Sequence, residues 1–454
     1  MDLNELIKKY STSGPRYTSY PTAPQWTEDL KTASYREQLQ KSFSGRTEPI
    51  ALYVHIPFCE ALCYYCGCNI QITKDHSRSQ SYLQSLIQEI RTVAEIIGTR
   101  QTLSQISWGG GTPTFFTCQE IEQLHLATLK YFDLAGDAEV SIEIDPRVTT
   151  WDQLATLRRL GFNRVSLGVQ DFNTEVQKVI NRIQSVQLTG DMLKECRRLG
   201  FSGINFDLIY GLPLQTRETF RKTLEEVISL RPDRIALYNY AHLPSLRPHQ
   251  KIMDKYARPN SEDRLAIFSE GYTDFTSQGY RSIGMDHFAL ETDELFLAIE
   301  KETLYRNFMG YTVKRGAGMI GIGASAIGEI GGSYFQNIRE TKPYEDSVNS
   351  EGVAAFRGCL LTQDDKERKW IIQQLMCKFV LRFQEYQKLF QKDFAQQFQS
   401  EILKLSDFSQ EGILKVDSDS IVITDLGRLF IRNVAMIFDA YLNLPTGATY
   451  SKTL

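Results

Sequence analysis

Apolar residues follow two alternating spacings between residues 50 and 240 of this chain. Short runs rich in β-branched residues, such as 50–56 and 203–210, alternate with longer stretches such as 79–97, in which apolar residues recur every three to four positions. The short runs predict buried strands, and the longer stretches predict amphipathic helices. Strands joined by helices in this order predict a parallel sheet with right-handed crossovers.

The alternation yields six strand units. The expected strands are 50–56, 105–108, 139–144, 164–169, 203–210 and 234–240, and the expected helices between them are 79–97, 119–131, 150–160, 186–199 and 217–230. Six units fall short of the eight of a full barrel, so we expect an α/β fold built as a partial (β/α)6, TIM-like barrel.

The two ends of the chain have a different pattern. A helical pattern over 3–10 precedes a stretch rich in glycine, proline and hydroxyl residues, which predicts an extended arm. After residue 360, we expect helices over 364–383, 385–398 and 426–442 and a hairpin of 413–416 with 420–424. This order resembles a winged-helix-like domain. We therefore expect an arm (1–48), an α/β catalytic domain with a C-terminal extension (49–360) and a mostly helical accessory domain (361–454).

Composition narrows the possible partners. The chain has 454 residues, 42% hydrophobic and 23% charged, as expected of a globular protein. Its 51 Lys and Arg against 55 Asp and Glu create no field that recruits nucleic acid, and the accessory domain lacks a strong basic stripe. The N-terminus has no apolar signal-peptide core, and no apolar run reaches membrane-spanning length. We expect a cytoplasmic protein with neither nucleic acid nor membrane as a partner.

Four of the eight cysteines lie within residues 59–68. Cys59, Cys63 and Cys66 form a CxxxCxxC pattern that can converge on one metal centre, and thiolates favour zinc, copper(I) or an iron-sulfur cluster. Structural zinc usually takes two separated cysteine pairs, and this chain has no second pair, so zinc is the weaker interpretation. Buried core cysteines would have no reason to cluster in this way.

Polar or glycine residues follow each expected strand, where parallel α/β folds place their sites. Gly109–Gly111 follow the second strand and allow a ligand to approach the backbone closely. Glu143 and Asp145 end the third strand, either as a general acid/base pair or simply as the polar end of a strand. A carboxylate at this position suits a ribose diol or an ammonium group.

The cysteine pattern resembles that of the radical S-adenosylmethionine (SAM) superfamily. This resemblance implies one four-iron four-sulfur cluster held by Cys59, Cys63 and Cys66, with one iron open to SAM. An electron passed through the cluster then cleaves SAM to a 5′-deoxyadenosyl radical. The triple glycine resembles the segment that receives the methionine amino group in these enzymes.

Further motifs resemble one family along essentially the whole chain. They are GPRYTSYPT (14–22), HIPFC with CGCN (55–69), WGGGTP (108–113), EIDPR (143–147), GVQDF (168–172), NFDLIYGLP (205–213), NYAHLP (239–244), GMDHFA (284–289) and RNFMGYT (306–312). Together they resemble the oxygen-independent coproporphyrinogen III oxidases (coproporphyrinogen dehydrogenases) of heme biosynthesis. The implied reaction is oxidative decarboxylation of coproporphyrinogen III to protoporphyrinogen IX by radical chemistry. The implied partners are an electron donor such as flavodoxin or ferredoxin and an unknown terminal electron acceptor, and we expect a monomer.

The family binds two SAM molecules, and matching positions imply the contacts here. Those for the first SAM are Tyr53, Gly110, Glu143 and Ile327, and those for the second are Gly111, Thr112, Gln170, Arg182, Asp207 and Ala241. Tyr65 resembles the aromatic residue near the adenine, and Cys68 resembles a fourth cysteine that is not a ligand. Without the resemblance, Arg182 would be interpreted as a surface residue of a turn. Arg16, His287 and Arg306 are candidates for the substrate carboxylates.

Two alternatives remain open. Heme-binding chaperones share the fold and the cysteine pattern, but Cys68 and the arm favour the enzyme. A zinc-stabilised scaffold would require a protein without iron. The glycine-rich segment 319–332 superficially resembles a dinucleotide loop but lacks the surrounding βαβ unit, so we interpret 321–327 as an edge of the SAM site. Residues 244–260 look less like the family.

Overall fold

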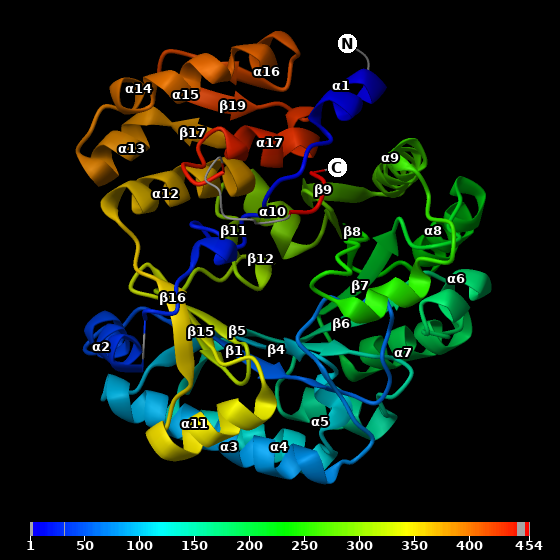
Figure 1. Cartoon of the computed structure of the whole chain (residues 1–454), viewed down its shortest axis with the longest axis vertical. Coiled ribbons are helices and arrows are strands. Elements are labelled where there is room, and N and C mark those ends of the chain that lie inside the picture. Colours follow the sequence, from blue (N-terminus) through cyan, green and yellow to red (C-terminus); the bar gives the residue numbers. More distant parts are fainter. Residues whose placement is uncertain (1–2, 31, 443–449, 454) are drawn as a thin grey trace. The chain divides into compact units, whose positions relative to one another are not determined.

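The computed structural model describes residues 3–30, 32–442 and 450–453 (Figure 1). The chain divides into two compact units. The first, here called the barrel unit, comprises residues 27–274 and 314–360, and the second, the composite unit, comprises residues 1–26, 275–313 and 361–454. In the described part of the chain, no helix has both the length and the apolar character required to cross a membrane.

Parallel strands form the centre of the barrel unit. In spatial order, which is also chain order, they are β1 (Ile50–Ile56), β4 (Thr102–Gly110), β5 (Asp133–Ile144), β6 (Arg164–Gln170), β7 (Gly203–Tyr210) and β8 (Arg234–Asn239). The predicted parallel α/β sheet is therefore confirmed. Strand β1 is almost wholly buried, as expected where helices cover a parallel sheet.

Helices connect these strands, and local sequence signals fix their ends. They are α3 (Ser77–Ile97), α4 (Cys118–Tyr131), α5 (Trp151–Arg159), α6 (Thr174–Val179), α7 (Val186–Leu199) and α8 (Arg217–Leu230). Thr117 and Glu120 form a capping box at the start of α4, and Gly98 ends α3 in the left-handed conformation. Figure 1 shows α3 and α4 side by side beneath the strands, with α11 (Thr341–Glu351) beside α3.

Within the barrel unit, the sequence analysis missed four further strands of this sheet. Strand β13 (Met319–Ile322) pairs in parallel with β1, and β14 (Ile327–Ile330), β15 (Ser333–Asn337) and β16 (Ala355–Cys359) continue the sheet in antiparallel fashion. Glycines interrupt the strand pattern of β13 and β14. A larger residue would not fit at Gly321, since a Cβ there would lie 2.7 Å from the Ile327 backbone. Helices α2 (Thr32–Phe43) and α9 (Ser261–Ser277) and the 3₁₀ helix η3 (Pro248–Met253) complete this part of the chain.

The composite unit is assembled from separate segments of the chain. Its first two segments supply α1 (Leu3–Tyr10), the hairpin β9 (Tyr280–Gly284) with β10 (His287–Leu290), α10 (Glu294–Glu300) and the hairpin β11 (Tyr305–Asn307) with β12 (Gly310–Thr312). Its last segment supplies α12 (Gln363–Lys378), α13 (Phe383–Phe390), α14 (Phe394–Gln397), α15 (Gln399–Lys404), α16 (Ser406–Gln410), η4 (Gly427–Phe430), α17 (Ile431–Met436) and the sheet of β17 (Val380–Arg382), β19 (Ser420–Ile423) and β18 (Leu414–Val416).

All three expected helices of the last segment are wrong in extent. The expected helix 364–383 ends at Lys378, because Phe379 adopts a left-handed conformation with φ of 57° and residues 380–382 form β17. The expected helix 385–398 is two helices, because Gln391 adopts a left-handed conformation with φ of 57° and ends α13. The expected helix 426–442 consists of η4 and the short α17. The predicted hairpin is present, and β17 joins it as a third strand.

Buried Arg432 connects the first and last segments of the composite unit. Its Nε donates to the Pro15 carbonyl at 3.0 Å, and its Nη1 donates to the Lys452 carbonyl at 2.8 Å. An antiparallel bridge also joins Ser13 and Lys452. The two segments are therefore interlocked, although more than 400 residues separate them along the chain.

Candidate active site

The loop after β1 carries the cysteine pattern, and a small sheet closes it. Strand β2 (Phe58–Cys59) pairs in parallel with β3 (Gln71–Ile72), so both ends of the loop are fixed to each other. The Gln71 N–H donates to the Pro57 carbonyl at 2.8 Å, and the Thr73 N–H donates to the Cys59 carbonyl at 3.0 Å. This closure holds the cysteines of residues 59–68 within one compact loop, here called the cysteine loop.

Side chains from distant parts of the barrel unit hold the backbone of the cysteine loop. Asn181 donates to the Leu62 carbonyl at 2.8 Å. The segment around η3 supplies three more contacts: Arg247 to the Gly67 carbonyl at 2.7 Å, His249 to the Cys66 carbonyl at 2.9 Å and Gln250 to the Tyr65 carbonyl at 3.0 Å. The sequence analysis missed these anchors. Their only signal was a run of Arg, His and Gln that follows the sixth expected strand.

The three thiols of the pattern have different partners. The Cys59 sulfur lies 3.4 Å from the Thr112 hydroxyl, and burial raises the pKa of Cys59 to about 12. Cys63 is buried and receives N–H groups of Arg147 at 3.4 Å and Arg182 at 3.8 Å. Cys66 accepts the backbone N–H of Cys68 at 3.4 Å, and the Cys68 thiol lowers the pKa of Cys66 to about 7. Metal binding requires the thiolate form, so it would displace the proton of Cys59.

A single metal ion and an iron-sulfur cluster require different arrangements of thiols. Among the described residues, no three His, Cys, Asp or Glu side chains converge closely enough to hold one metal ion. A zinc ion needs all its sulfur ligands about 2.3 Å from one point, whereas each thiolate of an iron-sulfur cluster binds a different iron. Three thiols on one loop, each able to bind a different iron, fit a cluster of several irons.

The triple glycine at the end of β4 packs directly against the cysteine loop. The Gly111 N–H donates to the Ile56 carbonyl at 2.9 Å, and the Thr112 N–H donates to the Phe58 carbonyl at 2.8 Å. A Cβ at Gly110, where φ is 115°, would lie 2.5 Å from the His55 ring, and one at Gly111 would lie 2.6 Å from Pro57. Only glycine permits this approach, which brings the turn against β1 and the start of the cysteine loop.

Glu143, at the end of β5, faces this glycine turn. Its carboxylate accepts the Gly110 N–H at 3.1 Å, which is its one hydrogen-bond donor among the described residues. The side chain keeps access to solvent, but the surrounding protein removes enough water to raise the pKa of Glu143 to about 7, and the Asp207 charge adds to this. A carboxylate can accept about four hydrogen bonds, so Glu143 has acceptor capacity left for a ligand.

Arg182 is buried, with 5% of its surface exposed, so the interpretation as a surface residue is wrong. Its Nη1 donates to Asp145 at 2.9 Å, and its Nη2 donates to the Gly168 carbonyl at 2.6 Å. Its Nε is buried without a protein partner among the described residues. Burial works against its charge, but the neighbouring Tyr65 and Asp145 hold the pKa of Arg182 above its usual range. One donor of this guanidinium therefore remains for a ligand.

The other residues implied for the SAM sites belong to the same region of the barrel unit. Gln170 has a left-handed backbone with φ of 67°, and a Cβ at Gly168 would meet both its amide and Arg182 within 3 Å. Asp207 accepts hydrogen bonds from Ser166 at 2.7 Å and Asn205 at 2.9 Å. These contacts fix the orientation of the Asp207 carboxylate.

Two further pairs connect this set of residues. Gln250 bridges the carbonyls of Tyr65 and Ala241, at 3.0 and 3.3 Å. Ile327 packs against Gly321, which pairs with Tyr53 across β13 and β1. The structure thus brings the predicted residues together around the carboxyl ends of the parallel strands, and the thiols, the glycine turn and the open carboxylate fit a cluster with SAM.

The three candidates for substrate carboxylates meet within the composite unit. Arg16 forms an ion pair with Asp286, and the His287 ring lies 2.9 Å from the same carboxylate. Burial opposes ionisation of Asp286, but the Arg16 charge and His287 hold its pKa well below its usual range. Arg306 donates to the carbonyls of Arg16 and Tyr17, at 2.9 and 2.8 Å. These three side chains are therefore engaged with the protein itself.

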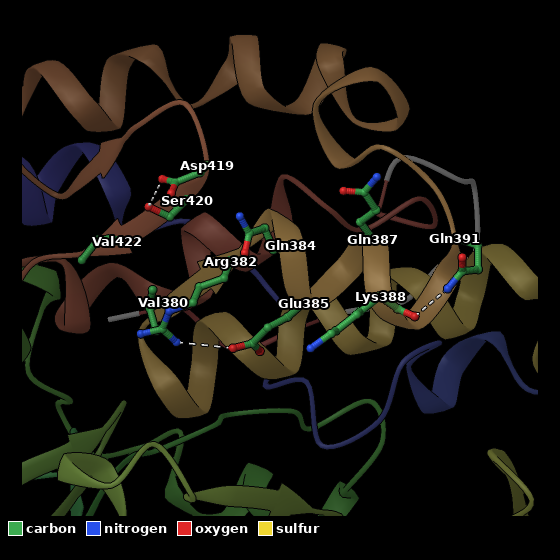
Figure 2. A pocket seen from close by; sticks show the side chains of 10 residues that line it. All are labelled: Val380, Arg382, Gln384, Glu385, Gln387, Lys388, Gln391, Asp419, Ser420 and Val422. Atoms are coloured by element: carbon green, nitrogen blue, oxygen red, sulfur yellow. Dashed lines mark hydrogen bonds and ion pairs between the residues drawn. The ribbon is translucent and has the colours of Figure 1, made fainter.

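A separate pocket of about 750 Å³ lies in the composite unit between α13, β17 and β19 (Figure 2). Its lining carries both charge signs, and the Arg382 guanidinium lies 3.5 Å from the carboxylate of Glu385, three residues further along the chain. Arg382 also pairs with Glu302 at 2.6 Å. None of the predicted site residues lines this pocket.

Comparisons with known proteins agree with this site. Residues 53–227 match the Radical SAM superfamily, and residues 361–430 match the HemN C-terminal domain. The chain is therefore a radical SAM protein with a HemN-type C-terminal domain.

Whole-chain relatives specify the family. An oxygen-independent coproporphyrinogen III oxidase of Salmonella typhimurium is 44% identical over 437 residues, which cover 96% of this chain and 95% of the relative. One from Pseudomonas aeruginosa is 43% identical over 440 residues, with the same coverage of both chains. The structure of coproporphyrinogen III oxidase (HemN) from Escherichia coli, described as a radical SAM enzyme, matches with a TM-score of 0.91 at 40% identity over 97% of this chain and 100% of that chain. The chain belongs to the family of oxygen-independent coproporphyrinogen III oxidases.

Proposed function

We propose that this protein converts coproporphyrinogen III to protoporphyrinogen IX without oxygen, by oxidative decarboxylation of the propionates on rings A and B. The observation that carries this proposal is the cysteine loop packed against the glycine turn, with Glu143 open beside it. The substrate is assigned from relatives of that name, which match over nearly the whole chain. A radical is needed because the propionate β-carbon has no proton acidic enough for a base to remove.

In this proposal Cys59, Cys63 and Cys66 hold a four-iron four-sulfur cluster, which when bound supplies the electron that cleaves SAM. Glu143 and the Gly110 backbone receive the first SAM, with Tyr53 and Ile327 beside them. The free acceptor capacity of Glu143, beside the Gly110 N–H, supports this role. Cys68 is not a ligand, in keeping with its exposed position in the loop.

A second SAM is proposed to contact Gly111, Thr112, Gln170, Arg182, Asp207 and Ala241, with Tyr65 near an adenine. Asp207 suits a ribose diol because Ser166 and Asn205 already orient its carboxylate. Arg182 offers its Nε, since Asp145 and the Gly168 carbonyl occupy its other donors. Tyr65 packs against the apolar cluster around Ile180 and is only partly buried.

Other features of the proposal concern partners and organisation. We propose a cytoplasmic monomer that takes electrons from a flavodoxin or ferredoxin and passes the electrons of substrate oxidation to a separate acceptor. The division into an arm (1–48), a catalytic domain (49–360) and an accessory domain (361–454) stays a prediction, and the match of residues 361–430 to a C-terminal domain supports its last boundary.

The test is an anaerobic assay of the reconstituted protein with SAM, a reductant and coproporphyrinogen III. We expect protoporphyrin after oxidation of the products, together with 5′-deoxyadenosine. Cys66→Ser should abolish both products and lower the iron content, while Cys68→Ser, two residues further on, should retain the iron. If SAM is cleaved, the tetracarboxylate returns unchanged and heme binds tightly, the protein is a heme chaperone instead.

A further inference from the structure

Of the three thiols in the cysteine pattern, Cys63 is the one that two guanidinium groups approach. Its sulfur lies 3.4 Å from Nη2 of Arg147 and 3.8 Å from Nη1 of Arg182. Cys59 has a neutral hydroxyl beside its sulfur, and Cys66 has a backbone N–H. The guanidinium of Arg247, near Cys66, points to the Gly67 carbonyl at 2.7 Å. Cys63 is therefore the sulfur that receives guanidinium hydrogen bonds, whereas Arg247 and Arg182 act on Cys66 through their charge alone.

We propose that Arg147 is a positioning residue for the iron-sulfur cluster, which through its hydrogen bond to the Cys63 sulfur makes the cluster easier to reduce. This inference rests on the proposed function, because it assumes a cluster on Cys59, Cys63 and Cys66. Hydrogen bonds to the sulfurs and nearby charge are among the factors that set the potential of such clusters. Arg147 is not among the residues implied for either SAM.

The protein holds Arg147 in place before any cofactor binds. Its Nε donates to Oδ1 of Asp145 at 3.0 Å, and its Nη2 donates to Oδ2 at 2.6 Å, which forms a bidentate pair. The Arg147 backbone N–H also donates to Asp145 at 3.0 Å. Nη1 reaches the Asn181 carbonyl at 3.4 Å, in the turn that leads to Arg182. The guanidinium thus has little freedom to leave the sulfur.

The local charge balance gives the direction of the effect. Asp145 carries one negative charge and pairs with both Arg147 and Arg182, so the group has a net charge of one positive unit. Asp145 is 8% and Arg182 5% exposed, so water screens this charge weakly. A positive charge beside the sulfur stabilises the more negative, reduced cluster. Neutralising Arg147 leaves the group uncharged, and the cluster should then be harder to reduce.

The experiment compares Arg147→Met and Arg147→Lys with wild type, after anaerobic reconstitution of the full chain without SAM. Arg159→Met is the matched control, because Arg159 forms an exposed ion pair with Glu122 on the surface. Iron and sulfide content and melting temperature are measured first, and the cluster is then titrated electrochemically with detection by electron paramagnetic resonance. These measurements do not depend on turnover.

We expect Arg147→Met to shift the midpoint potential to a more negative value. At the wild-type midpoint, the ratio of reduced to oxidised cluster should fall about three- to tenfold, in line with the loss of one hydrogen bond of ordinary strength. Arg147→Lys should fall between Arg147→Met and wild type, because lysine keeps the charge but cannot form the bidentate pair. Arg159→Met should match wild type. Loss of iron from Arg147→Met with an unchanged melting temperature of the cluster-free protein also supports the proposal.

Two results would overturn it. The first is full iron content with an unchanged midpoint potential in Arg147→Met. The second is loss of iron together with a lower melting temperature of the cluster-free protein in both Arg147→Met and Arg147→Lys. That result would make Arg147 a purely structural residue. If wild type itself takes up no iron, the proposed function fails instead, and the two failures are thereby distinguished.

Discussion

Two glutamates of the barrel unit have the same raised pKa and opposite surroundings. Burial raises the pKa of Glu89 to about 7, and the protein around Glu143 has the same effect. Glu89 has no exposed surface and accepts hydrogen bonds from the Gly323 N–H at 2.8 Å, the Asn337 amide at 2.8 Å and the Tyr344 hydroxyl at 2.6 Å. Glu143 accepts one, from Gly110. A perturbed pKa therefore does not identify a ligand site here, whereas unused acceptor capacity does.

The Glu89 region supports the region around Glu143. Glu89 lies on α3 and holds the turn between β13 and β14 through Gly323. Tyr82 adds a second link to this turn, since its hydroxyl donates to the His55 carbonyl at 2.8 Å and accepts the Ala324 N–H at 2.8 Å. Ile327, an implied SAM contact, begins β14 at the end of this turn. Glu89 thus stabilises the turn that precedes Ile327, whereas the Glu143 carboxylate is the one available to a ligand.

The strongest test of this contrast is Glu143→Ala. We expect SAM to bind about 10- to 150-fold more weakly to the cluster-loaded variant, the range for the loss of a hydrogen bond to a charged group, and turnover to fall at least as far. The melting temperature should stay close to that of wild type, because the substitution deprives only the Gly110 N–H of its partner. Anaerobic equilibrium dialysis gives the affinity. Unchanged binding would remove Glu143 from the site.

The matching test is Glu89→Gln, which should act on stability. The Gln amide nitrogen cannot accept a hydrogen bond, so at least one of the three donors loses its partner inside the protein. We expect a cost of about 1–3 kcal/mol in the free energy of unfolding, measured in urea. SAM affinity of the folded fraction should change little. A variant with wild-type stability and lost SAM binding would reverse the assignment of the two glutamates.

Their pH dependences should run in opposite directions. The pKa of Glu89 is higher in the folded protein than its ordinary value of about 4.5, so its contribution to stability is complete below pH 4.5 and is lost as the pH rises through 7. Glu89→Gln should flatten this part of the stability profile. SAM affinity through ionised Glu143 should instead rise about tenfold from pH 6 to pH 8, and Glu143→Gln should abolish that rise. A parallel trend in both profiles would contradict the distinction.

The smallest expected effect is that of Tyr344→Phe. The change removes one of the three donors to Glu89 and leaves the ring in place, so it should cost about 1 kcal/mol of stability. SAM affinity should equal that of wild type. Chemical denaturation measures the first and dialysis the second, and a loss of affinity would mean that this network reaches the ligand directly.

Sequence patterns predicted the parallel strands well because local signals and burial agree there. The bounds of α7 match the expectation, since Ser185 caps its start and Gly200 adopts the left-handed conformation at its end. Strands β13 and β14 were missed because glycines, which a strand pattern does not favour, lie at their closest approach to each other. Motif spacing identified the thiols and Glu143, but whether their roles follow the family stays a prediction.

Contacts between distant residues could not be predicted in this way. Nothing in the sequence near Arg147 indicates that its guanidinium reaches Cys63, 84 residues earlier in the chain. Glu89 occupies one position of an amphipathic helix, and its partners come from a turn, a strand end and another helix. Such networks depend on the tertiary fold, which residue spacing alone does not specify.

The interlocking of the chain's ends has a consequence for biosynthesis. A ribosome releases residues 13–15 long before it reaches Arg432 and Lys452, which hold the arm through its carbonyls and a strand bridge. The composite unit therefore cannot close until translation is almost finished, whereas residues 27–274 of the barrel unit are complete much earlier. During that interval residues 13–15 lack the residues that they contact in the folded protein. A nascent chain stalled before residue 432 should therefore carry a barrel that folds and an arm that proteases can cleave.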